Sequence, residues 1–89
     1  MPTLSMFYGI VVRMNKEDGA QHNLPHVHAF HAGDEASFDI ATGKVLAGDL
    51  PQDDVVKVQA WISIHREDLL ANWNLLTTEG QFFKIDPLR

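Results

Sequence analysis

The stretch PHVHAFHAGDEASFDI, residues 25–40, decides the fold because it contains two alternating segments joined by a turn. Within residues 26–31 and 35–40, apolar and polar side chains alternate with the period of a half-buried strand. The AGD sequence at 32–34 is typical of a hairpin turn, and Pro25 favours an extended backbone at the preceding residue. This stretch therefore predicts two antiparallel strands that share one apolar face.

Further strands are predicted on both sides of this hairpin. Residues 3–14 alternate without interruption and predict one long strand, with one face made of Leu4, Met6, Tyr8, Ile10, Val12 and Met14. The polar segment 15–24 connects this strand to the hairpin. ATGK at 41–44 predicts a second turn, and VLAGDL at 45–50 predicts a short fourth strand.

The second half of the chain predicts one long helix that begins after Pro51. Asp53 and Asp54 in its first turn complement the helix dipole, and no residue breaks the pattern from 52 to about 78. Apolar residues recur at three- and four-residue spacing: Val55, Val58, Ile62, Leu69, Trp73 and Leu76. The segment 81–89 is expected to be extended, with Phe82 or Phe83 packed into the core. We expect an α+β fold, an antiparallel β-meander of about four strands covered by one long C-terminal-half helix, then a short extended tail.

Length and composition limit the class of protein. A chain of 89 residues with 45% hydrophobic residues fits a single globular domain that spans 1–89. No apolar run is long enough for a membrane span, the N-terminal segment has no basic leader, and cysteine is absent, so we expect a cytoplasmic protein. The formal charge of −5 disfavours a nonspecific RNA partner.

Four of the five histidines lie between residues 22 and 31 and suggest a functional surface. In a strand, side chains two residues apart share a face, so His26 and His28 point the same way and His31 points the opposite way. If the apolar residues of both hairpin strands face the core, the opposite face carries His26, His28, Glu35, Ser37 and Asp39, with Arg13 from the first strand as a further candidate. We predict acid–base catalytic roles for His26 and His28, with Arg13 stabilising negative charge.

The His-x-His spacing also suits a divalent metal ion such as zinc. Two imidazoles on one side of a strand can bind one ion when another residue completes the ligand set. His26, His28 and Asp39 are the candidate ligands, with Glu35 or His22 as alternatives. The simpler interpretation is that these imidazoles bind backbone groups or pair with the nearby carboxylates.

The predicted helix supplies a fifth histidine, His65, as a further catalytic candidate. Trp61, His65 and Asn72 lie along one helical stripe. If this stripe faces the sheet, His65 approaches the strand histidines, and Asn72 can orient its imidazole as a general base requires. The alternative is a helix histidine hydrogen-bonded at the edge of the core.

Several blocks of the chain resemble a bacterial family known only as a domain of unknown function. The blocks are MPTLSMFYGIVVRM at 1–14, HNLPHVHAFHAG at 22–33, GDLP at 48–51, VQAWISIHREDLLANWNL at 58–75 and FFKIDPLR at 82–89. The positions that match the family pattern are Pro25, His26, His28, Ala29, Trp61, His65, Asn72 and Trp73. Many relatives carry Tyr where this chain has His31.

The resemblance implies a bacterial cytoplasmic protein, and relatives are often encoded beside a second small domain of unknown function, a pairing like a toxin–antitoxin module. Three hypotheses follow. In the first, the chain is a component of such a pair and cleaves an RNA phosphodiester. In the second, it is a non-catalytic module that binds a small protein encoded nearby. In the third, it is a small domain that binds a divalent metal. Self-association of the chain is left open.

Overall fold

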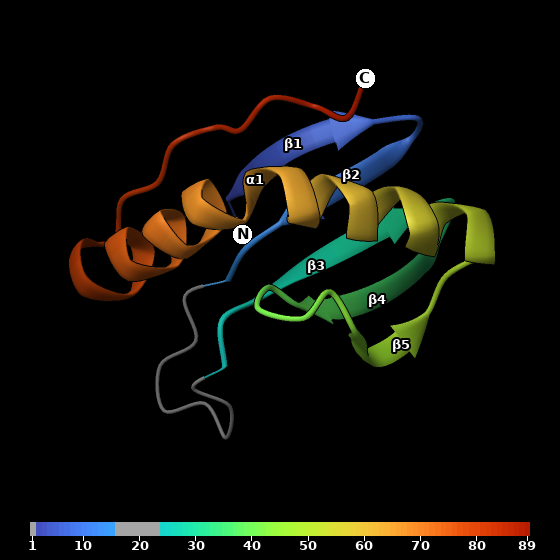
Figure 1. The fold of residues 1–89 in the computed structure, drawn as a ribbon, viewed down its shortest axis with the longest axis horizontal. Coiled ribbons are helices and arrows are strands. Elements are labelled where there is room, and N and C mark those ends of the chain that lie inside the picture. Colours follow the sequence, from blue (N-terminus) through green and yellow to red (C-terminus); the bar gives the residue numbers. More distant parts are fainter. Residues whose placement is uncertain (1, 16–23) are drawn as a thin grey trace.

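A computed structural model describes residues 2–15 and 24–89 and shows a five-stranded antiparallel sheet beside one long helix (Figure 1). The elements are β1 (Thr3–Phe7), β2 (Ile10–Arg13), β3 (His26–His31), β4 (Asp34–Asp39), β5 (Val45–Asp49) and α1 (Gln52–Glu79). The strands lie in the order β1-β2-β3-β4-β5, so each pairs with its neighbour in sequence. The predicted α+β class, with a meander followed by a long helix, is confirmed.

The prediction of one strand over residues 3–14 is wrong, because the chain reverses at Tyr8 and Gly9. Both residues have positive φ angles, 50° and 79°, and Phe7 pairs with Ile10 across the turn. Positive φ at both central residues is the pattern of a two-residue type I′ hairpin turn. The sheet therefore has five strands rather than about four.

The predicted apolar face of this segment also changes. The register of β1 against β2 shifts between Thr3 and Ser5. Such an irregularity breaks the simple alternation of side chains along the strand. As a result Phe7 is buried, whereas Met6 and Tyr8 are 65% and 59% exposed.

The core lies between the sheet and α1, as the alternation in the hairpin predicted. Its fully buried members include Val27, Ala29 and Phe38 from the sheet, Ile40 just after β4, and Val58, Trp61, Ile62 and Leu69 from the helix. Trp73 packs against this core and is only partly buried. Burial of such side chains is the main term that stabilises a small α+β fold.

The helix is not regular throughout, contrary to the prediction of an uninterrupted element. His65 has φ −110° and ψ 22°, which lies in the bridge region between helical and extended backbone. The next side chain, Arg66, donates from Nε to the carbonyl of Ile40 at the end of β4 (2.8 Å). The bend therefore coincides with a contact that links the helix to the sheet.

The tail, residues 81–89, runs back along β1 from the end of α1 (Figure 1). Gly80 ends the helix in the left-handed conformation, and Ile85 donates its N–H to the carbonyl of Leu4 (2.9 Å). Ile85 is buried, while Phe82 and Phe83 are 42% and 39% exposed, so the prediction that a phenylalanine packs inside is wrong. The register of the tail is set by its backbone contacts, which the hydrophobic pattern does not reveal.

Candidate functional site

The residues of the histidine surface come from three neighbouring strands. We use this name for Arg13, His26, His28, Phe30 and Glu35. In the sheet, His28 lies opposite Arg13 of β2 and opposite Ser37 of β4. Because Val27 and Ala29 are buried on the α1 side, His28 and Phe30 lie on the face that the helix does not cover.

An imidazole–carboxylate pair forms part of this surface. Nδ1 of His28 donates to Oε2 of Glu35 (3.2 Å), with the two side chains 16% and 50% exposed. An ionised carboxylate only accepts hydrogen bonds, so this contact assigns the Nδ1 proton and leaves the lone pair of the neutral ring on Nε2. Glu35 therefore fixes His28 in the tautomer with an unprotonated Nε2, which a general base or metal ligand requires, and the Nε2 atom itself is buried.

His26 is oriented in the same tautomer by the backbone. Its Nδ1 donates to the carbonyl of Leu24 (2.7 Å). The rings of His26 and His28 meet edge to face with centroids 5.1 Å apart, and the ring of Trp73 from α1 lies 5.1 Å from His26. Two imidazoles thus lie side by side with the same nitrogen assigned as donor.

Arg13 places its guanidinium beside this pair. Its Cζ atom lies 5.4 Å from the centroid of the Phe30 ring, and that ring in turn stacks against His28. Nε of Arg13 is buried and has no hydrogen-bond partner in the part of the chain that the structure describes. The surface therefore combines two imidazoles, a carboxylate and a cation. His26 is only 5% exposed, and the hollow at this surface is lined by His28 and Glu35 but not by His26 or Arg13.

Asp39, the third candidate metal ligand, lies opposite His26 in the register of β3 and β4. Its Oδ1 accepts the backbone N–H of Ala41 (2.8 Å), so the carboxylate also shapes the turn after β4. Within residues 2–15 and 24–89, no group of three or more His, Asp or Glu is arranged to hold a metal ion. His22, the alternative ligand, lies outside the described residues.

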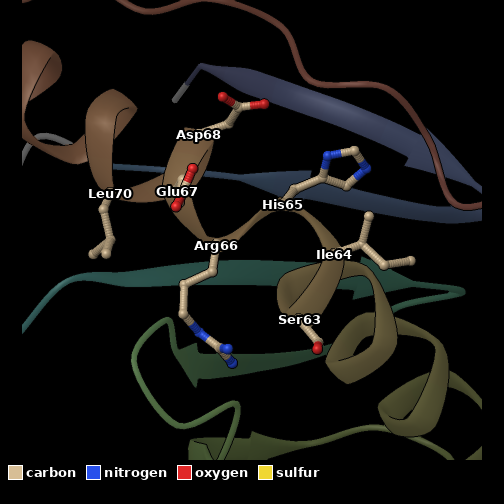
Figure 2. A pocket seen from close by; sticks show the side chains of 7 residues that line it. All are labelled: Ser63, Ile64, His65, Arg66, Glu67, Asp68 and Leu70. Carbon is tan, nitrogen blue, oxygen red and sulfur yellow. The ribbon is translucent and has the colours of Figure 1, made fainter.

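His65 occupies a different part of the molecule. Its ring lies 5.8 Å from that of Trp61, and it lines a hollow with Ile64 and residues 86–89 of the tail. Figure 2 shows its imidazole directed toward β1 and the tail. Because His28 lies on the face away from α1, the sheet separates these two histidines.

Asn72 and Trp61 hold the tail. The Asn72 amide donates to the carbonyl of Phe83 (2.9 Å) and accepts the N–H of the same residue (2.8 Å). Trp61 donates from Nε1 to the carbonyl of Asp86 (2.8 Å). Asn72 therefore binds the tail backbone, rather than serving as the partner of His65 that the helical spacing suggested.

A second imidazole–carboxylate pair was not predicted from the sequence. Nδ1 of His31 donates to Oδ2 of Asp54 (2.8 Å), with the two side chains 35% and 7% exposed. The residue at the N-cap of α1 is Pro51, which has no N–H for the usual capping contact with an acidic side chain in the first turn. The sequence contained one signal for this pair: the alternation of β3 directs His31 toward the helix side, where it can contact the Asp54 carboxylate.

The chain belongs to the family described as a domain of unknown function (DUF4160), whose model matches residues 9–74. The matched region includes all three candidate histidines, Arg13 and Asp54. No curated protein and no solved structure matched the chain. In the described part of the chain, α1 does not contain an apolar stretch sufficient to cross a bilayer.

Proposed function

We propose that the protein is one component of a toxin–antitoxin-like pair and that its histidine surface cleaves RNA phosphodiester bonds. The observation that carries this proposal is the hydrogen bond between Nδ1 of His28 and Glu35, beside the ring of His26. A carboxylate on one ring nitrogen orients the imidazole and stabilises the cation that forms when the other nitrogen takes a proton. General acid–base catalysis needs such an oriented imidazole.

The proposed reaction uses the ribose 2′-hydroxyl as the nucleophile. One imidazole takes the hydroxyl proton at Nε2 and the oxygen attacks phosphorus, while the other imidazole, protonated on both ring nitrogens, donates its Nε2 proton to the departing 5′ oxygen. Because Nε2 of His28 is buried, this reaction requires a side-chain movement that exposes it to the substrate. The products are a 2′,3′-cyclic phosphate and a new 5′-hydroxyl end. Arg13 stabilises the negative charge that builds on the phosphoryl oxygens through its guanidinium.

The proposal includes a small protein partner encoded nearby and a cytoplasmic location, where RNA is accessible. The formal charge of −5 limits the nonspecific affinity for RNA. The substrate is therefore expected to be bound through local contacts at the histidine surface rather than through a long basic track.

Expression of the chain without its neighbour tests the proposal. Wild type is expected to inhibit growth and to release cyclic phosphate ends from RNA, whereas H28Q removes both effects. H65Q is the matched control, because this imidazole lies on the other side of the sheet. A harmless wild type that binds the neighbouring protein as well as H28Q does would overturn catalysis and support a non-catalytic interaction module.

A second candidate function, binding of a divalent metal such as zinc, is favoured by the hydrogen bonds of the two Nδ1 atoms. Histidine ligands commonly donate their second ring nitrogen to a carboxylate or a backbone carbonyl. His28 and His26 follow this pattern with Glu35 and the Leu24 carbonyl, respectively. Calorimetric titration with zinc is expected to show one site that H26Q and H28Q abolish and H65Q retains; equal binding by all variants would reject it.

A further inference from the structure

The solvent side of α1 carries an apolar stripe that no described segment of the chain covers. Val56 and Ile64 are 52% and 66% exposed, and Ala60 between them is also exposed. The three residues are spaced four apart, so they lie in one line along the helix. The solvent side of a surface helix is normally polar, which makes this line of exposed apolar groups unusual.

Acidic side chains border the stripe at both ends. Asp53 lies one turn before Val56, and Glu67 and Asp68 follow Ile64; all three are exposed. The helix contains only two Lys or Arg residues. Lys57 lies over the ring of Tyr8 with Nζ 5.6 Å from its centroid, and Arg66 binds the carbonyl of Ile40. Both cations are therefore directed to the flanks of the helix, and the solvent side is apolar and acidic.

A hollow adjoins the stripe where the helix bends. It has a volume of about 480 Å³ and is lined by residues 63–68 and Leu70. In Figure 2, His65 and Arg66 leave the helix on opposite sides, toward β1 and toward the β4 side of the sheet. The carboxylates of Glu67 and Asp68 also line this hollow, which suits a cationic side chain.

We infer that this stripe is the docking surface for a basic amphipathic helix of a partner protein. An apolar line on one helix can pack against the apolar face of another, with Ala60 allowing close approach. Lysine or arginine side chains at the edges of the partner helix would meet Asp53 at one end and the Glu67–Asp68 pair at the other.

The charges also argue against a second copy of the chain as the occupant. Packing two such stripes together would bring the acidic ends of one helix near those of the other, in a protein whose formal charge is already −5. Like charges across an interface disfavour association. The inference is independent of the proposed catalysis, since His28 lies on the other side of the sheet.

The test uses a synthetic, fluorescein-labelled amphipathic helix made of leucine, alanine and lysine, and a matched peptide with glutamate in place of lysine. Fluorescence anisotropy is expected to show that the basic peptide binds at least about tenfold more tightly at low salt. Its affinity should fall as the salt concentration rises, because exposed charges are screened. NMR shift changes should map the contact to residues 53–68.

The decisive variant is V56S/I64S, which removes the apolar anchors without touching the core. Its affinity for the basic peptide is expected to fall about tenfold or more, because the apolar area buried by the two anchors is lost. V45S/L46S is the matched control, because Val45 and Leu46 of β5 are exposed to a similar extent, 41% and 45%. Circular dichroism checks that both variants fold.

Three results would overturn the inference. The first is equal affinity of wild type and V56S/I64S for the basic peptide, and the second is equal affinity of wild type for the two peptides. The third is evidence that something other than a basic helix covers the stripe. This evidence would be a wild-type dimer in sedimentation that V56S/I64S abolishes, or binding to phosphatidylglycerol vesicles that depends on Val56 and Ile64.

Discussion

The two imidazole–carboxylate pairs lie on opposite faces of β3 and differ in burial. His28 and His31 are three residues apart in sequence, yet His28 pairs with a half-exposed carboxylate at 3.2 Å and His31 with a buried one at 2.8 Å. The His31–Asp54 pair joins β3 to the first turn of α1, whereas the His28–Glu35 pair joins two adjacent strands. The same chemistry therefore joins β3 to the helix through a buried carboxylate on one face, and joins two neighbouring strands through an exposed carboxylate on the other.

Asp54→Ala is expected to have the largest effect on stability. The substitution removes the buried carboxylate that accepts the hydrogen bond from His31, so the free energy of unfolding should fall by about 2–3 kcal/mol. Denaturation with urea measures the change. Asp53→Ala is the matched control from the same helical turn, because Asp53 is exposed, and it should cost less than about 0.5 kcal/mol. Equal losses in the two variants would show that the His31–Asp54 contact does not link the elements.

Gly9→Ala tests the packing of the β1–β2 turn against the imidazole of His31. A Cβ at Gly9 would lie 2.8 Å from Nε2 of His31, and the φ of 79° already disfavours a side chain. We expect a loss of about 1–3 kcal/mol in unfolding free energy.

Gly33→Ala separates the two causes of this loss. Gly33 has a φ of 89°, but nothing lies within 4 Å of an added Cβ, so this variant carries the backbone strain alone. The excess cost at Gly9 measures the contact with His31. If Gly33→Ala costs as much as Gly9→Ala, the imidazole moves aside and the turn does not depend on it.

Much of the fold could be predicted because the hairpin and the helix have clear periods. Strict alternation defined β3 at His26–His31 and directed His28 to the face opposite Val27 and Ala29. The recurrence of buried apolar residues such as Val58, Ile62 and Leu69, together with the absence of Gly and Pro, predicted α1. In these elements the local pattern agrees with the tertiary packing.

Other features could not be predicted because their causes are tertiary. Apolar residues continue on both sides of Tyr8 and Gly9, so the two-residue turn resembles the interior of a strand. The bend at His65 has no Gly or Pro and coincides with the distant contact between Arg66 and Ile40. The sequence predicted that Asp54 complements the helix dipole, but it did not reveal the pairing of Asp54 with His31, which is 23 positions away.

Glu35→Gln tests the exposed pair and should change stability only slightly. The contact with His28 is accessible to water, so its loss is expected to cost about 0.2–1 kcal/mol and less at high salt. Urea denaturation at two salt concentrations measures this, with Ser37→Ala as a control on the same strand. A loss as large as that of Asp54→Ala would show that the two pairs have the same structural role.

His28→Gln should change stability much less than Asp54→Ala and should have the greatest consequence for the proposed activity. Glutamine keeps hydrogen-bonding capacity but removes the titratable imidazole, whose ring is 16% exposed and contacts His26 and Phe30, so the unfolding free energy should fall by about 0.5–1 kcal/mol. Wild type should release cyclic phosphate ends from RNA and the variant should not. A stable variant that cleaves RNA as well as wild type would exclude His28 from catalysis. A variant that unfolds as readily as Asp54→Ala would instead show that the histidine surface is structural, and the contrast between the two faces of β3 would fail.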